Sequence, residues 1–124
     1  NGAELVQSDR GYNVFRNGTH VGMIRKITST RGYNGEIDLL IALTLVPFTE
    51  EREVMSVRVI RHEETPGIGD KIEQDVSDWI HQFAGKSAQN THWALSPGGD
   101  IDAISGATIT SRAVTSAIAE ALSE

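Results

Sequence analysis

The sequence contains no cysteine among its 124 residues. Disulfide bonds, thiolate metal sites, iron–sulfur clusters and cysteine nucleophiles are therefore excluded. Its 11 lysine and arginine residues form no basic run, and 17 acidic residues bring the formal net charge to -6. Because nucleic-acid phosphates and anionic lipid headgroups attract clustered basic side chains, this composition argues against either of them as the direct partner.

Long hydrophobic runs and metal-ligand patterns are also missing. The longest apolar run, Ile37–Val46, contains Asp38 and is too short to cross a bilayer as a helix. We expect no metal site, because no ligand spacing is found among the four histidines, His20, His62, His81 and His92. A serine–histidine–aspartate triad cannot be argued from residue order, because such triads are recognised by their geometry.

The chain does have the composition of one soluble globular domain. Hydrophobic residues make up 39% and charged residues 23% of the sequence, and this length is enough to bury a core without covalent cross-links. Asn17-Gly18 supplies the two positive φ angles of a tight hairpin turn between two arms rich in strand-forming residues. We expect a second hairpin through residues 47–52.

Alternation of apolar side chains predicts the two strands that flank this second hairpin. One face of the strand over residues 37–46 carries Ile37, Leu39, Ile41, Leu43 and Leu45. Leu40, Ala42 and Val46 add apolar surface to the other face, so we expect a central strand that is covered on both faces. Pro47 ends it. The next strand, residues 53–62, alternates at Met55, Val57 and Val59.

The hydrophobic period then changes to that of a helix over residues 70–83. Its apolar face comprises Ile72, Val76, Trp79, Ile80 and Phe83. We expect Asp70 to cap this helix, with Glu73 in a capping-box relation, and Gly85 to end it.

The rest of the chain reads as a loop and a second helix. The loop spans residues 85–100 around an apolar segment at Trp93–Leu95, and the final helix includes residues 112–122. Strands first and helices later indicate an α+β fold, a single domain in which an antiparallel sheet built from hairpins carries packed helices.

Two stretches are candidates for a binding site, and the first is Glu64–Lys71. Glycine lets the main chain approach a flat ligand or a phosphate. Because residues 65–69 turn sharply before a helix, Gly67 or Gly69 is expected to adopt a backbone conformation closed to other residues. The alternative is a plain connection between a strand and a helix. We expect the adjacent pair Glu63 and Glu64 to be solvated charges rather than a general base.

The second stretch is Asp102–Ser111, which gathers four hydroxyl residues, one glycine and one carboxylate before the final helix. Three of the hydroxyls compete to cap that helix: Thr108, Thr110 and Ser111. Capping needs only one hydroxyl. The alternative is an anion bound by the free amides, the helix dipole and the spare hydroxyls at the helix start.

At these residues the chain resembles a known family. "DAISGAT", Asp102–Thr108, matches the flavinylation pattern Asp-x-x-(Ser/Thr)-Gly-Ala-Thr of FMN-binding domains, which occur in the G subunit of the Rnf electron-transport complex and the C subunit of the sodium-pumping NADH:quinone reductase. "GYNGEIDLLIAL", residues 32–43, is similar to the family's Gly-Tyr-x-Gly-x-Ile block, and "HEETPGIGDKI", residues 62–72, to its Glu-Thr-Pro-Gly-(Leu/Ile)-Gly loop. The residues of the first and third blocks resemble the G subunit of the Rnf complex more than the C subunit of the reductase.

The resemblance implies a covalent cofactor and a set of residues around it. FMN would be attached to Thr108 through a phosphoester, by a separate flavin transferase that uses FAD as donor. Asp102 would belong to the pattern that the transferase recognises, or would accept backbone amides in the turn at Ser105-Gly106. Further cofactor contacts would come from Ser105, Gly106, Ala107, Thr110, Ser111, Glu64, Thr65, Gly67, Ile68, Gly69 and Lys71.

The implied function is that of an electron carrier. Residues 1–124 would be the FMN-binding domain of a membrane-bound, ion-translocating oxidoreductase complex that links ferredoxin and NAD, and would not turn over a substrate alone. Its partners would be the other proteins of the complex and the transferase. We expect it on the periplasmic side of the inner membrane, anchored by an N-terminal helix trimmed from a chain that begins at Asn1. The alternatives are a domain like the C subunit of the sodium pump, or a non-covalent binder of FMN or another phosphorylated ligand.

Overall fold

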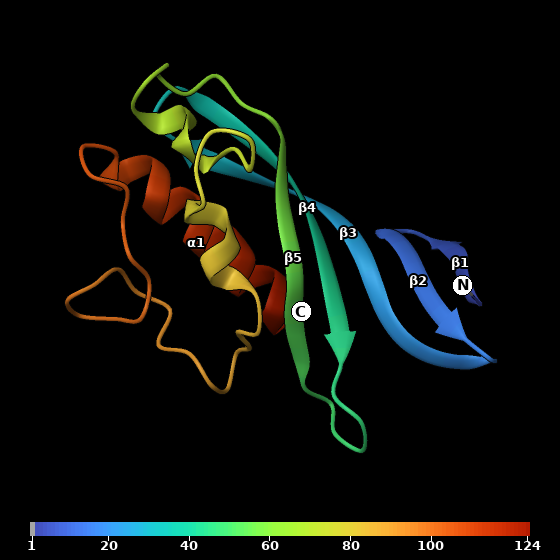
Figure 1. The fold of residues 1–124 in the computed structure, drawn as a ribbon. Helices are drawn as coiled ribbons and strands as arrows, with labels where there is room; N and C mark the ends of the chain where they lie inside the picture. Colours follow the sequence, from blue (N-terminus) through green and yellow to red (C-terminus); the bar gives the residue numbers. More distant parts are fainter. Residues whose placement is uncertain (1) are drawn as a thin grey trace.

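A computed structural model describes residues 2–124 as a five-stranded antiparallel sheet with one long helix packed across one face (Figure 1). The strands lie in chain order: β1 (Ala3–Ser8), β2 (Gly11–Arg16), β3 (Thr19–Gly32), β4 (Gly35–Leu45) and β5 (Arg52–Arg61). Two short 3-10 helices, η1 (Gly69–Ile72) and η2 (Trp79–Phe83), precede the helix α1 (Thr108–Ser123). The expected α+β fold is confirmed. No helix within residues 2–124 is long and apolar enough to cross a membrane.

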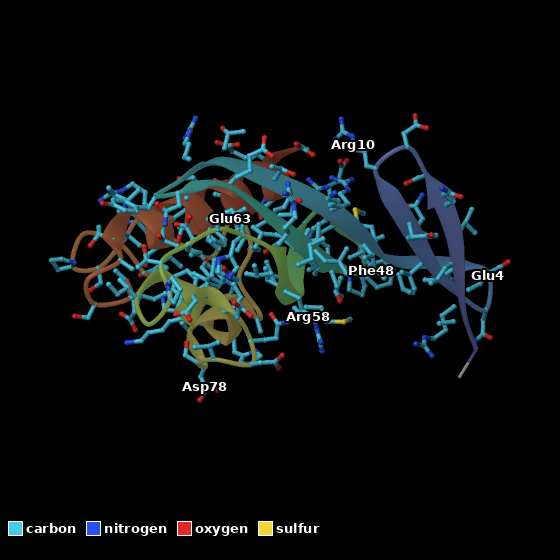
Figure 2. The ribbon with its side chains drawn as sticks, turned by 90° about the horizontal axis from the view of Figure 1, so that it is seen from above. Glu4, Arg10, Phe48, Arg58, Glu63 and Asp78 are labelled. Carbon is cyan, nitrogen blue, oxygen red and sulfur yellow. The ribbon has the colours of Figure 1, made fainter. Side chains whose placement is uncertain are left out.

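The first predicted hairpin turn is confirmed by its backbone. Asn17 and Gly18 have φ angles of 52° and 80°, the two positive values that join β2 to β3 tightly. The β1–β2 hairpin, which carries Glu4 and Arg10, extends beyond the part of the sheet that the helix covers (Figure 2). The packed body of the domain is therefore built on β3, β4 and β5.

The core lies between the inner face of the sheet and α1. The inner residues of β4, Ile37, Leu39 and Ile41, are fully buried. From the other side they meet Val114 and Ile118 of α1, with further apolar side chains supplied by Ile72, Ile80 and Phe83. Burying one such side chain contributes about 1.5–3 kcal/mol relative to leaving it exposed. This burial holds the start of α1 at one end of the sheet.

The outer face of the sheet corrects two expectations about the strands. Leu40 is 37% exposed, so the prediction that β4 is covered on both faces is wrong; α1 and the 3-10 segments cover only the inner face. Met55 is 62% exposed rather than buried. The register shifts there, with Leu43 opposite Val54 and Ala42 opposite Ser56, so a β-bulge turns Met55 outward and Val54 inward.

The predicted helix over residues 70–83 is wrong. Glu73 has extended backbone angles that end η1 at Ile72, and the chain turns before η2 begins at Trp79. Side chains of the intervening segment bind β5 and its end: Glu73 Oε2 lies 2.6 Å from His62 Nε2, and the Val59 amide donates to Gln74 Oε1 at 3.2 Å. These contacts hold residues 73 and 74 against β5 and the residue that follows it, so the chain does not continue as a helix.

The apolar pattern of that segment is partly preserved. Ile72, Ile80 and Phe83 are buried as expected, whereas Val76 is 49% exposed. Neither predicted cap forms, because Asp70 and Glu73 direct their carboxylates to Gly67 and His62. Short tertiary contacts therefore override the periodicity over residues 73–78.

Three aromatic side chains pack together and hold the loop over residues 84–107 in place. Trp79 packs edge-on against Phe83 with ring centroids 5.3 Å apart, and Trp93 stacks on the same ring at 6.1 Å. Trp93 also donates its indole N–H to the Ser87 carbonyl at 3.0 Å. Ala84 has extended backbone angles that end η2 at Phe83, and the amide of Gly85, whose φ is 84°, donates to the Val54 carbonyl at 2.8 Å, so the expected helix stop at Gly85 is wrong.

Candidate functional site

A half-open cleft of about 520 Å³ lies where three segments that are distant in sequence meet. They are the turn between β3 and β4, the loop that leads into η1, and the start of α1, which gather at the upper left of Figure 1. The walls are formed by Tyr33, Thr65, Ile68, Gly69, Gly106, Ala107, Thr108, Ile109 and Thr110. None of these nine residues carries a charged side chain, so the cleft suits a largely apolar group.

Thr108 lies at the mouth of this cleft as the first residue of α1. Ala107 occupies the N-cap position, and no side chain caps the helix. Within residues 2–124 the exposed Thr108 hydroxyl has no hydrogen-bond partner, and no carbonyl accepts the amides of Thr108, Ile109 or Thr110. A free hydroxyl thus stands beside three free amides at the positive end of a helix dipole, where an anion is stabilised.

The expected competition among hydroxyls to cap α1 is wrong. Ser111 is fully buried; its hydroxyl donates to the Ala107 carbonyl at 2.8 Å and accepts from the Ile104 amide at 2.9 Å. Thr110 donates its hydroxyl to Glu64 Oε1 at 2.5 Å. The Ser111 hydroxyl thus holds the segment before α1, and the Thr110 hydroxyl binds the loop at Glu64. Of the three hydroxyls, only that of Thr108 makes no hydrogen bond within residues 2–124.

Glu64 lies directly behind the cleft. The expectation of a solvated charge is wrong for this residue, since it is only 3% exposed, although Glu63 beside it faces solvent. The Glu64 carboxylate accepts the amides of Tyr33 and Asn34, each at 2.9 Å, in addition to the Thr110 hydroxyl. One buried side chain therefore joins all three segments of the cleft.

The two glycines of the loop before η1 are needed for different reasons. Gly67 has a φ of 79°, which confirms the expected conformation closed to other residues, and its amide donates to Asp70 Oδ1 at 2.9 Å. Gly69 has an ordinary φ but no room for a side chain, because an added Cβ would lie 2.9 Å from Glu64 Cβ. Gly67 thus allows the turn of the loop, and Gly69 allows its backbone to pack closely against the Glu64 side chain.

In a domain that carries the flavin implied by the resemblance, we expect Gly67→Val to change the spectrum and reduction potential of that flavin without preventing its attachment to Thr108. Valine is disfavoured at this positive φ, so the chain carrying Thr65 and Ile68 must shift, whereas Thr108 belongs to another segment. Absorbance spectra and redox titrations of the flavinylated variant measure the effect.

Gly85→Val is the matched control for that loop. Gly85 also has a positive φ and open space around it, but it does not line the cleft. If the Gly67 variant keeps the spectrum and potential of the unsubstituted protein, the loop is only a connector.

Asp102 is held by its backbone and presents its side chain to solvent. Its carbonyl accepts the Trp79 indole N–H at 2.6 Å and the Gln82 side-chain amide at 3.1 Å, and its own amide donates to Gln82 Oε1 at 2.8 Å. Its carboxylate makes no hydrogen bond within residues 2–124, including to the turn at Ser105-Gly106. The chain therefore fixes where Asp102 lies and leaves the carboxylate accessible.

The structure brings most of the predicted site residues together. Seven of them line the cleft: Thr65, Ile68, Gly69, Gly106, Ala107, Thr108 and Thr110. Ser105, Ser111, Gly67, Lys71 and Glu64 are not among its walls. Sequence reasoning missed Tyr33 and Ile109, exposed by 65% and 49%, which add apolar surface at the rim. The Gly-Tyr-x-Gly block contained a signal for Tyr33, but it was used only as part of the family resemblance.

Comparison with known proteins gives one family match that covers most of the chain. The model of the FMN-binding domain family matches residues 32–123, which include all three cleft segments. In the solved structures, the fold is similar to that of Shewanella oneidensis NqrC, with a TM-score of 0.58 and 23% identity over 95% of this chain and 62% of that one.

Curated relatives are more similar in sequence. The chain is 45% identical over 105 residues to the G subunit of the ion-translocating oxidoreductase complex of Escherichia coli (strain K12), covering 82% of this chain and 48% of the relative. The protein of the same name from Photorhabdus laumondii is 42% identical over 113 residues, which are 88% of this chain and 52% of the relative. The chain thus spans about half the length of these relatives.

Proposed function

Because the chain belongs to the FMN-binding domain family, we propose that it is an electron-carrier domain whose FMN is joined to Thr108 through a phosphoester bond. The observation that carries the proposal is the unengaged Thr108 hydroxyl at the mouth of an uncharged cleft. When bound, FMN supplies reversible electron transfer, and the protein supplies orientation, hydrogen bonds and local charge.

The start of α1 suits both the bond and the charge that it brings. In attachment, the Thr108 oxygen would bond to the FMN phosphorus of FAD as the pyrophosphate bond breaks, so AMP would leave and the hydroxyl proton would pass to a base. The phosphoester keeps a negative charge, which the free amides of Thr108, Ile109 and Thr110 stabilise. No basic side chain lines the cleft, and these amides lie at the attachment point itself.

The cleft suits the flavin ring. Tyr33, Ile68 and Ile109 offer exposed apolar and aromatic surface around it. Gly69 lets the main chain lie close to Glu64, so the wall at this position is backbone. The ring would rest against these groups while Thr108 holds its phosphate end.

The setting that we propose is a membrane-bound complex of the Rnf type. The curated relatives are G subunits of ion-translocating oxidoreductase complexes. By analogy, this domain passes electrons between other proteins of a complex that links ferredoxin and NAD to ion movement, on the periplasmic side of the inner membrane. A flavin transferase is its partner during maturation.

The proposal is tested by the mass of the denatured protein. The domain is produced with and without a co-expressed flavin transferase, denatured, and measured by intact-mass spectrometry, with peptide mapping of Asp102–Arg112. One FMN per chain, mapped to Thr108 and present only with the transferase, is the expected result. Complete release of flavin on denaturation would contradict it and would favour a non-covalent binding domain.

A further inference from the structure

Glu64 is a buried carboxylate without an ion-pair partner among residues 2–124. Burying a charge in this way is costly unless hydrogen bonds replace its hydration. Here three donors do so: Oε1 accepts the Tyr33 amide and the Thr110 hydroxyl, and Oε2 accepts the Asn34 amide. Both oxygens are occupied by donors, which is the arrangement that an ionised carboxylate requires.

The three donors and Glu64 itself together represent the three segments that form the cleft. Tyr33 and Asn34 lie in the turn between β3 and β4, Glu64 opens the loop before η1, and Thr110 lies in the first turn of α1. A further bond, from the Asn34 side-chain amide to the Thr65 hydroxyl at 3.1 Å, joins the first two segments again. The walls of the cleft are thus connected through one side chain.

The surroundings of Glu64 are built to bring it close to the cleft. Gly69 forms part of the cleft wall, and its missing side chain leaves the space that Glu64 Cβ and the Thr110 hydroxyl occupy. The Glu64 amide donates to His62 Nδ1 at 2.9 Å, which fixes the main chain on the other side. Glu64 therefore packs directly behind two residues of the cleft wall, with its Cβ against the Gly69 backbone and its carboxylate on the Thr110 hydroxyl.

We propose that Glu64 is a positioning residue that holds the three cleft walls together before the flavin arrives and places a fixed negative charge behind the bound ring. The proposal rests on the function proposed above. Two electrons from a reductant and one proton from solvent convert oxidised flavin into a reduced form with one additional negative charge. A nearby anion disfavours that form, so Glu64 lowers the reduction potential of the flavin.

The positioning role is tested first in the protein without flavin. Glu64→Gln keeps the size of the side chain but removes its charge and one of its two acceptor oxygens. We expect hydrogen exchange of the Tyr33 and Asn34 amides to become at least tenfold faster, with unchanged exchange in the middle of β4. Equal protection of both amides in the variant and the unsubstituted protein would overturn this role.

The electrostatic role is tested in the flavinylated protein by redox titration at pH 7. We expect the midpoint potential of Glu64→Gln to rise by at least about 30 mV, which is a tenfold change for a two-electron couple. Thr110→Val keeps the carboxylate but removes a donor that partly neutralises it, so its potential should stay the same or fall. A cleft that is merely loosened would shift both variants in the same direction, and that result would overturn the charge effect.

Asp38→Asn is the matched control, because Asp38 is also a buried carboxylate but accepts from Thr28 and Arg61 on the outer face of the sheet. It should leave the flavin potential unchanged; a shift equal to that of Glu64→Gln would overturn the inference. Intact mass is recorded before each titration. Absence of a flavin adduct on the unsubstituted protein contradicts the proposed function, whereas an adduct with an unmoved potential in Glu64→Gln contradicts only the role of Glu64.

Discussion

Thr108→Ala is expected to abolish covalent flavin completely while the domain remains folded. The alanine side chain has no oxygen to form the phosphoester, and the neighbouring Thr110 and Ser111 hydroxyls are already bonded inside the protein. The exposed Thr108 hydroxyl caps nothing, so its loss should change the free energy of unfolding by no more than about 0.5 kcal/mol. In-gel flavin fluorescence, intact mass and urea denaturation measure the two effects separately.

Thr108→Ser is the control for this substitution. It keeps a hydroxyl at the first position of α1, so it should accept flavin, with a rate that reflects only the lost methyl group. A fluorescent, flavin-bearing Thr108→Ala protein after denaturation would show that another residue carries the cofactor. That outcome would leave the fold and the cleft as described but would move the attachment point.

Asp102→Ala is expected to slow flavinylation strongly, with little effect on stability. The carboxylate is exposed and makes no hydrogen bond within residues 2–124, while the backbone of Asp102 is held by Trp79 and Gln82. A purely structural role would require contacts that the side chain lacks. We therefore expect its role to be recognition by the proposed transferase, which would have to bind this segment to place the Thr108 hydroxyl. We expect the free energy of unfolding of the flavin-free domain to change by less than about 1 kcal/mol.

The measurement compares flavinylation rates at several concentrations of the flavin-free domain. Asp78→Ala serves as the matched control, because Asp78 is an exposed carboxylate at the start of η2 (Figure 2) and lies outside the flavinylation pattern. Only Asp102→Ala should lower the rate. A normal rate in this variant would refute recognition, and a large loss of stability would indicate that the carboxylate supports the fold.

Features governed by neighbours in the chain were predictable from the sequence. The positive φ angles at Asn17 and Gly18 follow from the two residues themselves, and so does the one at Gly67. The alternation in β4 predicted its inner face, since Ile37, Leu39 and Ile41 are fully buried. The strands and the final helix followed from local periodicity, and with them the fold class.

Features governed by distant contacts were not predictable in the same way. The helix expected over residues 70–83 breaks because Glu73 and Gln74 bind His62 and Val59, which no local pattern encodes. Glu64 was interpreted as solvated because its partners lie 30, 31 and 46 residues away. For the site, the resemblance supplied Thr108, and only the fold brings Tyr33 to it across the cleft.

The position of Thr108 at the mouth of a half-open cleft has a consequence for occupancy. The proposed short tether at Thr108 would keep the ring at an effective concentration of about 1 mM, so a cleft that dissociates from free FMN at about 0.1 mM would still be filled about 90% of the time. Strong non-covalent affinity is then unnecessary. The cleft can therefore be shallow and leave part of the ring open to an electron-transfer partner. Selection can then act on the reduction potential that the cleft gives the flavin, and not on the affinity with which the cleft binds it.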